Sequence, residues 1–257
     1  MKEQLPNIEA FSLALLNTED LDPVYCMLWR AGLEPELLNR WLLAYFWFYH
    51  AGVASQIAES SDFFHTALWA FDNKWPRGAE RRHFRTSQAR DSILWFKHTY
   101  GTAANAIEAL GDGTFTQVAS RVRAWPMFGP WITFKVADML ERVLARSVSF
   151  IDCRLDGVYE EPVEGAKIAA REWGRPGLSF SDTVQLLLHA IGSRKAPPRY
   201  DRALNIQEIE TCFCKFKSHR RGHYAVGKDT KEIFHGLTGR GPLATRLQGA
   251  LMCKKSS

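Results

Sequence analysis

The chain has 257 residues, of which 46% are hydrophobic, 24% charged and 12% aromatic. That balance is typical of a globular protein and excludes a chain that is disordered throughout. Lys and Arg together number 33 against 28 Asp and Glu, so the formal net charge is +5. A small positive excess permits a polyanionic partner without requiring one, and the distribution of the charges has to decide.

No segment reaches the roughly 18 apolar residues that a membrane-spanning helix needs. The most apolar stretch, residues 41–54, contains His50 and Gly52 and predicts a single buried helix. The first residues lack the basic and apolar regions of a secretory signal, and the five cysteines are an odd, scattered set for disulfides. We therefore expect a reduced, cytoplasmic protein with no membrane contact and no structural metal.

Helical periodicity dominates the chain, and turn signals such as GDG (111–113) separate the helical stretches. The predicted helices are residues 36–50, 60–71, 87–100, 102–110, 115–124 and 182–191. No alternating strand pattern and no internal repeat occurs. We predict an all-α fold, with a helical domain over residues 1–195. A basic, glycine-rich C-terminal segment, residues 196–257, follows a Pro-containing stretch and is expected to pack on that domain.

A basic segment, WPRGAERRHFR (residues 75–85), lies between two of the predicted helices. Within nine residues it holds four arginines, Arg77, Arg81, Arg82 and Arg85. Arginine offers a planar fork that binds two phosphate oxygens at once, so the cluster favours an anionic ligand with several oxygens. The alternative is a solvated helix face, on which Glu80 offsets part of the charge.

Residues 121–146 predict two helices joined by a tight turn. Pro126 stops the first helix, Gly129 makes the turn, and Pro130 suits the first position of the next helix. That helix is expected over residues 131–146, with an inward face of Ile132, Val136, Met139, Leu140 and Val143. Free amides at a helix N-terminus attract phosphate, so the turn is a candidate phosphate site. An ordinary αα-hairpin is the alternative.

The stretch QEIETCFCKFKSHRRGHYAVGKD (207–229) mixes acidic, thiol and basic side chains. On a helix over residues 205–217, Glu210, Cys214 and Lys217 share one face. Such a cluster suits a nucleophilic site, but ordinary salt-bridge ladders look the same. Nothing here gives four ligands at zinc spacing. Glycines at positions 222, 227, 236, 239 and 241 predict flexible turns, and their basic neighbours favour a loop that closes over DNA.

The turn at Gly129, the apolar helix after it and Phe150-Ile151-Asp152 resemble the helix-hairpin-helix of the DNA glycosylase superfamily. In that superfamily a glycine-containing turn grips the DNA backbone and an Asp lies at the mouth of the pocket. The resemblance therefore implies a helix-hairpin-helix, glycosylase-like fold with Asp152 as a base or electrostatic stabiliser. A helix N-cap is the alternative role for Asp152.

Two positions depart from the superfamily pattern. Met127 replaces the first glycine of the turn. Trp131 stands where lyase-type glycosylases carry their Schiff-base lysine, and Lys135 lies one helical turn further on, facing another way. A lyase is therefore not expected.

The basic segment, the hairpin with its downstream FID and the motif IETCFCKFKSHRRGHYAVGKD occur in this order along the chain. Together they resemble the amino acid:DNA transferases, also called α-glutamyl/putrescinyl thymine pyrophosphorylases, of bacteriophage thymine-hypermodification pathways. The resemblance covers roughly residues 35–235, and the combination is more specific than any single motif. It implies an enzyme that acts in the cytoplasm of the infected bacterial host.

The resemblance implies a substitution on a DNA base. The substrate would be double-stranded DNA carrying 5-hydroxymethyluracil that a separate kinase has pyrophosphorylated. The enzyme would displace pyrophosphate with the amino group of a free amino acid or polyamine. No cofactor is expected, although a Mg²⁺ ion could accompany the diphosphate.

Each requirement of this reaction has candidate residues. The diphosphate needs positive charge, expected from Arg77, Arg81, Arg82, Arg85 and Lys135. The incoming ammonium needs a base, expected to be Asp152 or, in second place, Glu210. The carboxylate of an amino-acid donor would bind Lys215 or Arg220. DNA contacts are expected from Phe128, Gly129, Trp131, Arg221 and Lys228.

Two other functions stay open at this point. A monofunctional DNA glycosylase would share the fold and Asp152 but use water as nucleophile, with no pyrophosphate for the arginines to bind. A non-catalytic helical DNA-binding module would need neither Asp152 nor Glu210. The sequence leaves open the amine, the oligomeric state, the metal requirement, base flipping and the preferred DNA sequence.

Overall fold

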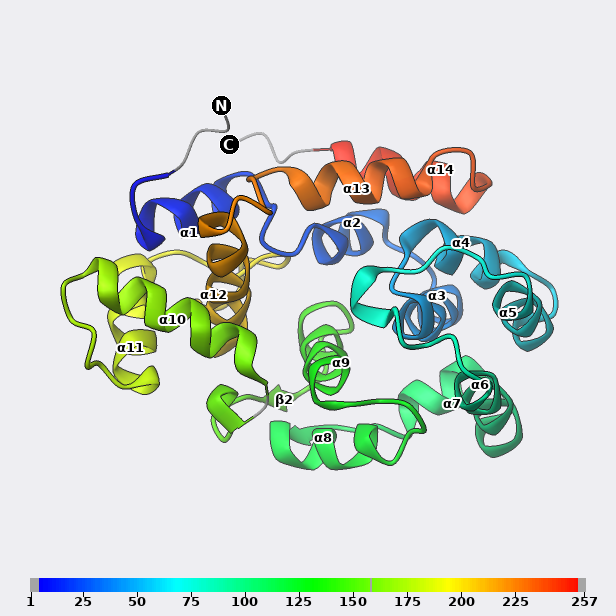
Figure 1. Cartoon of the computed structure of the whole chain (residues 1–257). Coiled ribbons are helices and arrows are strands. Elements are labelled where there is room, and N and C mark those ends of the chain that lie inside the picture. Colours follow the sequence, from blue (N-terminus) through cyan, green and yellow to red (C-terminus); the bar gives the residue numbers. More distant parts are fainter. Residues whose placement is uncertain (1–4, 158, 254–257) are drawn as a thin grey trace. The chain divides into compact units, whose positions relative to one another are not determined.

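The computed structural model describes residues 5–157 and 159–253 and is mostly helical (Figure 1). The all-α prediction is thereby confirmed. From the N-terminus to the hairpin, the helices are α1 (Ile8–Asn17), α2 (Pro23–Ala31), α3 (Pro35–Phe48), α4 (Ala51–Glu59), α5 (Phe63–Asp72), the 3₁₀ helix η1 (Ala79–Arg81), α6 (Ser87–Tyr100), α7 (Ala103–Glu108), α8 (Phe115–Arg123) and α9 (Pro130–Arg142). They are followed by the 3₁₀ helix η2 (Leu155–Gly157), α10 (Glu160–Glu172), α11 (Phe180–Ile191), α12 (Ile206–Arg220), α13 (Lys228–Leu237) and α14 (Pro242–Met252). The strands in the described part of the chain are β1 (Gly113–Thr114) and β2 (Val148–Ser149), which pair.

The chain folds as two compact units, each built from two stretches of sequence. The first unit comprises Met1–Cys26 and Ser149–Thr230, and the second comprises Met27–Val148 and Lys231–Ser257. The boundary expected from composition, between residues 195 and 196, falls inside the first unit.

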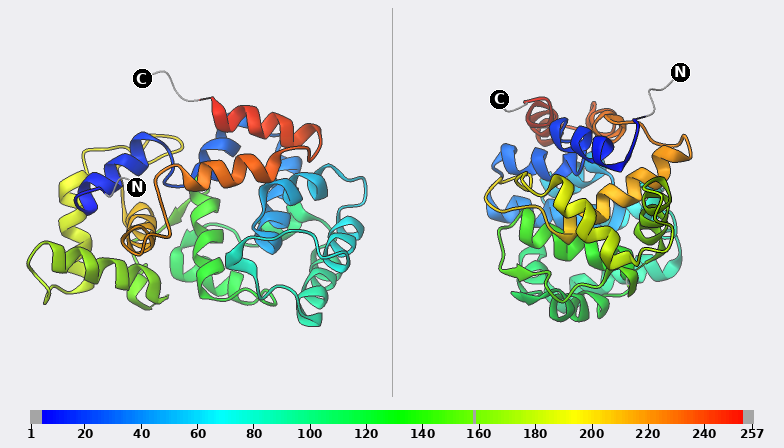
Figure 2. Two further views of the ribbon diagram at one scale, coloured as in Figure 1. Left: turned by 45° about the horizontal axis from the view of Figure 1, so that its top comes forward. Right: turned by 90° about the vertical axis from the view of Figure 1, so that its left-hand side faces the viewer.

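The first unit has a core formed by α1, α10, α11 and α12 (Figure 2). Phe11, Ile209 and Phe213 are fully buried in it. Helices α10 and α12 pack at Gly165, where an added Cβ would stand 2.1 Å from the Phe213 carbonyl oxygen. A glycine is therefore what lets the two helix backbones approach so closely.

The second unit has an aromatic core around α3. The Trp47 ring lies 5.3 Å from Phe96, which lies 4.8 Å from Trp125, and Trp125 lies 5.1 Å from Phe128. These edge-to-face contacts run from α3 through α6 into the turn before α9, and all four rings are buried. The turn is thus tied to the centre of this unit.

The apolar run at residues 41–54 forms two helices, so the prediction of one helix was wrong. Helix α3 ends at Phe48, and Tyr49 adopts a left-handed conformation with φ of +49°. His50 then caps α4, because its Nδ1 accepts a hydrogen bond of 3.2 Å from the Val53 amide. A capping side chain inside an apolar run starts a new helix where hydrophobicity alone predicts continuity.

The predicted pair of helices around Gly129 is present as α8 and α9. Gly129 is the N-cap of α9, and Pro130 takes its first position, as expected. Helix α9 ends at Arg142 rather than Arg146, and Ala145 lies in the left-handed region with φ of +55°. The five residues expected on the inward face of α9, from Ile132 to Val143, are all buried.

The C-terminal stretch is more regular than its glycines predict. Gly236 lies inside α13, so the prediction of a flexible turn at this glycine was wrong. Helices α13 and α14 lie side by side (Figures 1 and 2), and the Gln248 amide in α14 donates to the Phe234 carbonyl of α13. Helix α14 is bound to α4, since the Leu243 amide in its first turn donates a hydrogen bond of 2.8 Å to Glu59.

Candidate functional site

The arginine-rich segment packs against the C-terminal end of α3. Its only regular element among the described residues is the short η1. The Gly78 amide donates to the Phe48 carbonyl over 2.9 Å, and a Cβ on Gly78 would stand 2.6 Å from the Tyr49 carbonyl oxygen. The segment is therefore held by its backbone, not laid out as the solvated helix face considered above.

Arg81 is fully buried inside the second unit. Its Nε donates to the Trp47 carbonyl over 3.3 Å, and its Nη1 donates to the Met127 carbonyl over 3.0 Å. The guanidinium lies over the rings of Phe84 and Phe128, at 4.6 and 5.1 Å from their centroids. Arg81 thus links the end of α3 to the turn before α9.

The other arginines of the segment are progressively more exposed. Arg77 lies over the rings of Phe48 and Phe71, each at 5.2 Å. Arg82 and Arg85 are exposed. Arg77 and Arg81 each keep one buried guanidinium nitrogen without a hydrogen-bond partner, Nη1 and Nη2 respectively.

Burial and mutual repulsion act on these cations. Burial, and then the charge of Arg85, lowers the pKa of Arg77 to about 10. Burial, and then the charge of Arg77, lowers the pKa of Arg81 to about 9. Both groups remain charged at neutral pH, so the segment concentrates positive charge that an anion would relieve.

Three consecutive carbonyl groups of the turn before α9 accept hydrogen bonds, one from within the turn and two from other parts of the unit. The Trp125 carbonyl accepts from the Phe128 amide over 3.2 Å. The Pro126 carbonyl accepts from the Ser92 hydroxyl over 2.8 Å, and the Met127 carbonyl accepts from Arg81. Met127 itself lies in the left-handed region, with φ of +68°. A glycine favours that conformation, and glycine is the residue the superfamily pattern has at this position.

The three hairpin residues expected on DNA differ in exposure. Phe128 is buried in the aromatic core, Trp131 is half-buried with its ring 4.9 Å from that of Tyr49, and Gly129 is exposed. Gly129 has an ordinary φ of −82°, and no atom lies within 4 Å of an added Cβ. The fold itself therefore does not require a glycine at this position.

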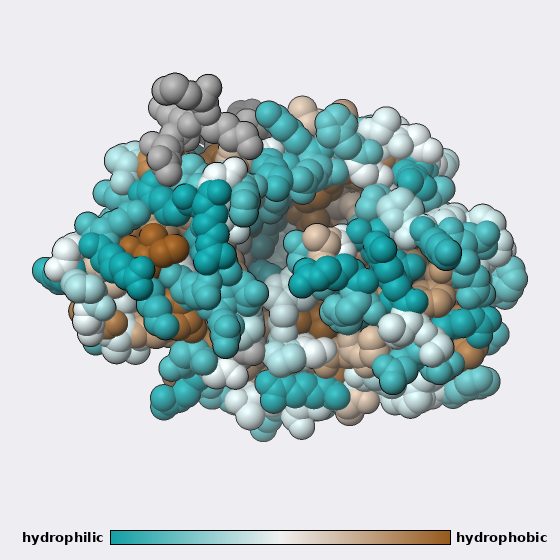
Figure 3. Space-filling model, in the orientation of Figure 1, coloured by the Kyte–Doolittle hydropathy of each residue, from teal (hydrophilic) through white to brown (hydrophobic). Residues whose placement is uncertain are grey.

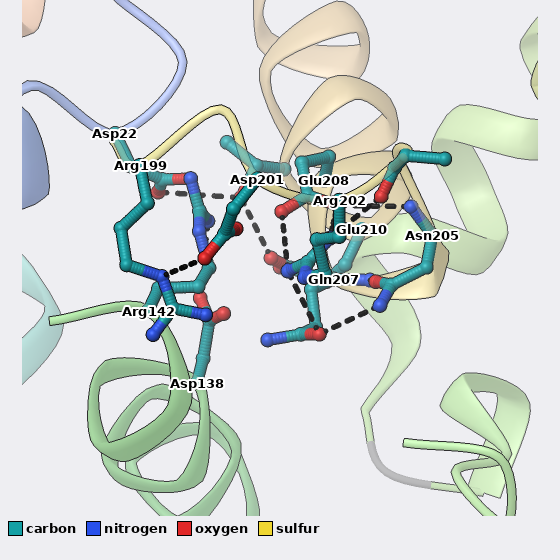
Figure 4. Close-up of polar contacts among 12 residues, drawn as sticks. Asp22, Asp138, Arg142, Arg199, Asp201, Arg202, Asn205, Gln207, Glu208 and Glu210 are labelled. Atoms are coloured by element: carbon teal, nitrogen blue, oxygen red, sulfur yellow. Dashed lines mark hydrogen bonds and ion pairs between the residues drawn. The ribbon is translucent and has the colours of Figure 1, made fainter. Parts of the chain in front are cut away.

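Helix α9 carries four buried charged residues, Lys135, Asp138, Glu141 and Arg142. Asp138 and Arg142 form an ion pair of 3.5 Å (Figure 4). Only Lys135 was singled out from the sequence. Charged residues at positions i, i+3, i+6 and i+7 of the apolar helix, in KVADMLER, are the signal that could reveal the others.

In the first unit, Glu210 is buried. Its carboxylate accepts from the Tyr159 hydroxyl, from the Thr211 hydroxyl over 2.9 Å and from the Cys214 thiol over 3.3 Å. The predicted pairing of Glu210 with Cys214 on one helix face is confirmed. Tyr159 was not anticipated, because no local spacing connects it with Glu210, 51 residues away.

The other acidic residue of α12, Glu208, has a structural role at the start of the helix. It accepts two hydrogen bonds from Arg202, of 3.0 and 3.1 Å, and one of 2.9 Å from the Asn205 amide (Figure 4). Asn205 and Glu208 form a capping box. Figure 4 also shows the ion pair of 2.9 Å between Arg199 and Asp201.

Asp152 is exposed and lies just after β2, beside Ile151, whose side chain is 91% exposed. The next helices begin at Leu155 and Glu160, and the N-cap of α10 is Tyr159. The structure thus gives Asp152 no N-cap role on α10.

The two cations expected to bind a donor carboxylate already have protein partners. Lys215 forms an ion pair of 2.6 Å with Asp229. Arg220 binds both carboxylate oxygens of Glu172, at 2.6 and 2.9 Å, and lies over the Phe216 ring.

The two C-terminal cations expected on DNA are also engaged. Arg221 is exposed and lies 3.2 Å from Glu164. Lys228 is half-buried and donates to the His223 carbonyl over 2.9 Å. The ion pair between Arg221 and Glu164 is solvent-exposed and therefore weak, so a phosphate can compete with Glu164 for the guanidinium group.

The predicted residues therefore form two groups. The arginine segment, Lys135 and the hairpin belong to the second unit, and Asp152, Glu210 and the C-terminal cations belong to the first. Within residues 5–157 and 159–253, no three His, Cys, Asp or Glu side chains gather as metal ligands, and no helix has the length and apolarity to cross a membrane. The face in Figure 3 is mostly hydrophilic, with scattered hydrophobic groups.

Comparison with known proteins gives a consistent result. Residues 4–224 match the family described as amino acid:DNA transferase. The chain is 39% identical over 260 residues to a glycinyltransferase of Pseudomonas phage PaMx11, covering 88% of each protein. It is 30% identical over 250 residues to a putrescinyltransferase of Delftia phage PhiW-14, covering 93% of this chain and 80% of that protein.

Proposed function

Because the chain belongs to the amino acid:DNA transferase family, we propose that it attaches an amine to a thymine-derived base in DNA. The base is 5-(pyrophosphoryloxymethyl)uracil, and the amino group of an amino acid or polyamine displaces its pyrophosphate. The family match over residues 4–224 carries the proposal. The two relatives are named for different donors, and glycine, the donor named in the more similar of these two, is the first amine to test.

The reaction is a substitution at the methylene carbon of the base. The donor ammonium first gives one proton to a base, because only a free lone pair can attack. The nitrogen lone pair then forms the C–N bond while the C–O bond breaks, and its electron pair leaves on the pyrophosphate oxygen. The nitrogen keeps its two remaining protons, so the product is a secondary ammonium, and charge and atoms balance.

The arginine segment is the proposed site for the diphosphate. Arg82 and Arg85 are exposed, and Arg77 is half-buried with an unpaired nitrogen. Their mutual repulsion is relieved when an anion binds. They stabilise the transition state more than the bound substrate, because negative charge on the diphosphate grows as it leaves. Lys135, in the same unit, is a further candidate cation.

Asp152 is the proposed base, with Glu210 as the second candidate. Asp152 is exposed and so accessible to a substrate as large as duplex DNA, whereas Glu210 is buried and already accepts three hydrogen bonds from neutral donors. A donor carboxylate would bind Lys215 or Arg220 in competition with Asp229 or Glu172.

DNA contact is proposed at the hairpin and at Arg221 and Lys228. The support comes from Gly129, whose open Cβ position lets a phosphate approach the N-terminal amides of α9. Phe128 contributes by packing in the core beneath the turn.

Mass spectrometry of nucleosides tests the function directly. A synthetic duplex with one 5-(pyrophosphoryloxymethyl)uracil is incubated with the enzyme and glycine, then with putrescine and glutamate. The proposal expects a nucleoside mass that gains the amine, together with free pyrophosphate. Release of a free base would instead identify a glycosylase, and an unchanged duplex with every amine would favour a DNA-binding module.

A further inference from the structure

We propose that Arg81 is a positioning residue, which holds the hairpin turn in its DNA-binding shape and does not itself bind the diphosphate. The inference rests on the proposed function, because it takes the hairpin to be the DNA contact. It also separates Arg81 from the other three arginines of the segment, with which its position in the sequence groups it.

The contacts of Arg81 are all internal. Its side chain has 0% relative exposure, and it donates hydrogen bonds to the backbone carbonyls of Trp47 and Met127. The Trp47 carbonyl belongs to the last turn of α3, the negative end of the helix dipole, where a cation is favourable. The Met127 carbonyl belongs to the turn before α9. One buried cation therefore fixes the distance between α3 and the turn.

The turn needs this support because of Met127. A residue with a side chain at φ of +68° is strained, and such a conformation persists only where neighbouring groups hold it. Arg81 holds it twice, through the carbonyl of Met127 and through the ring of the next residue, Phe128. Two residues further on, Gly129 caps α9. A change in the Met127 backbone would therefore redirect the amides that meet the phosphate.

The neighbouring carbonyl provides a natural comparison. Ser92 donates to the Pro126 carbonyl over 2.8 Å. The proline ring fixes φ of Pro126 but not the direction of its carbonyl, so this hydrogen bond also supports the peptide that precedes Met127. Loss of the Ser92 hydroxyl should therefore also weaken the turn, and Met127→Gly should compensate for it as it does for Arg81→Met. Arg81 and Ser92 thus hold the two peptide units on either side of the Met127 Cα.

The experiment measures binding of an unmodified DNA duplex and of a pyrophosphorylated duplex by fluorescence anisotropy, with thermal unfolding followed in parallel. We expect Arg81→Met to weaken binding of both duplexes about tenfold, the loss of roughly one well-placed contact. Glycine at position 127 adopts the left-handed conformation without strain, so adding Met127→Gly should restore most of the affinity. Met127→Gly alone should bind as the wild type does.

Recovery of DNA affinity in the double variant distinguishes this role from a general loss of stability. Met127→Gly restores no hydrogen bond to Trp47, so it can compensate only for the lost support of the turn. If Arg81→Met does not fold, Arg81→Lys replaces it. Lysine keeps one of the two carbonyl contacts, and its smaller loss should also be rescued by Met127→Gly.

Two results would overturn the inference. A variant that binds the unmodified duplex normally but loses its preference for the pyrophosphorylated one would place Arg81 on the diphosphate. A double variant as weak as the single one would show that the turn is not what Arg81 supports. Failure of the wild type to bind either duplex would be a failure of the proposed function, and would remove the inference with it.

Discussion

The backbone of Gly52 in α4 lies against that of Gly236 in α13, so that a Cβ on Gly52 would stand 1.9 Å from the Gly236 carbonyl oxygen. No rotamer relieves this contact, because the backbone fixes the position of the Cβ and the oxygen belongs to the main chain. The two glycines therefore determine how closely the C-terminal helices pack on α4. The adjacent hydrogen bond of 3.1 Å from Arg240 to Gln56 depends on the same approach.

Gly52→Ala should accordingly destabilise the protein, by about 3 kcal/mol, as overpacking of a tight interior does. Chemical denaturation of the variant and of Gly249→Ala measures the difference. Gly249 lies in α14 with no atom within 4 Å of an added Cβ, so alanine should be neutral or stabilising there. Equal stability of the Gly52→Ala variant and the wild type would mean that α4 and α13 separate at little cost.

Gly129→Ala should leave the free energy of unfolding within about 0.5 kcal/mol of wild type, because the position has room and an ordinary φ. Binding of a DNA duplex should nevertheless weaken, about fivefold or more, since the methyl group occupies the space next to the α9 amides. Thermal unfolding and fluorescence anisotropy on the same preparation separate the two effects. Unchanged affinity would remove the hairpin from the DNA interface.

Replacement of Arg82 and Arg85 by Ala should reduce transfer at least a hundredfold and affect binding of unmodified duplex only modestly. The exposed guanidinium groups are proposed to bind a diphosphate that only the modified DNA carries. Single-turnover rates and duplex binding are measured together. If both fall in equal proportion, the arginines contact the DNA backbone instead, and the slope of affinity against salt should then fall as well.

Asp152→Asn should lower the rate of transfer at least a hundredfold, the usual contribution of a general base, while duplex binding is retained. The amide has nearly the same shape but cannot take a proton from the ammonium. Glu210→Gln serves as the matched variant, because it tests the second candidate in the same way. If the rate of transfer falls only in Glu210→Gln, Glu210 is the general base and Asp152 is not.

His50 should make the protein less stable in mild acid. Burial, and then the charge of Arg240, lowers the pKa of His50 from its ordinary value of 6.5, so the unfolded chain takes up the proton first. Stability is therefore highest above that value and falls as the pH drops below it. Urea unfolding at pH 7.5 and 5.5 should show a smaller loss in His50→Asn, which keeps a side-chain acceptor for the α4 cap. An identical loss in both proteins would assign the acid sensitivity to other groups.

Local patterns were sufficient for the helices whose signals are strong. The helix at 87–100 and the start of α9 at Gly129-Pro130 follow from caps and periodicity. The break at Tyr49 was missed, since it depends on a histidine acting as a cap within an apolar run. Gly236 is predicted in a flexible turn but lies in α13, because no local pattern reveals that its backbone packs against Gly52 of α4.

At the candidate site, too, the sequence indicates residues but not their burial. The density of arginine indicates the basic segment, but it does not distinguish one of the four arginines from another. Only the fold shows that Arg81 is buried and Arg82 is exposed. The contact of Tyr159 with Glu210 joins positions 51 residues apart, which spacing rules do not reach. The sequence indicates where helices form, but it does not determine which side chains are buried by residues distant in the chain.

The free space around Gly129 has a consequence for laboratory evolution. A library screened only for soluble expression would accept nearly any small residue at this position, since nothing inside the molecule penalises it. A library screened for modified phage DNA would not. Comparing the two sets of survivors, position by position, would outline the DNA footprint without a complex being crystallised.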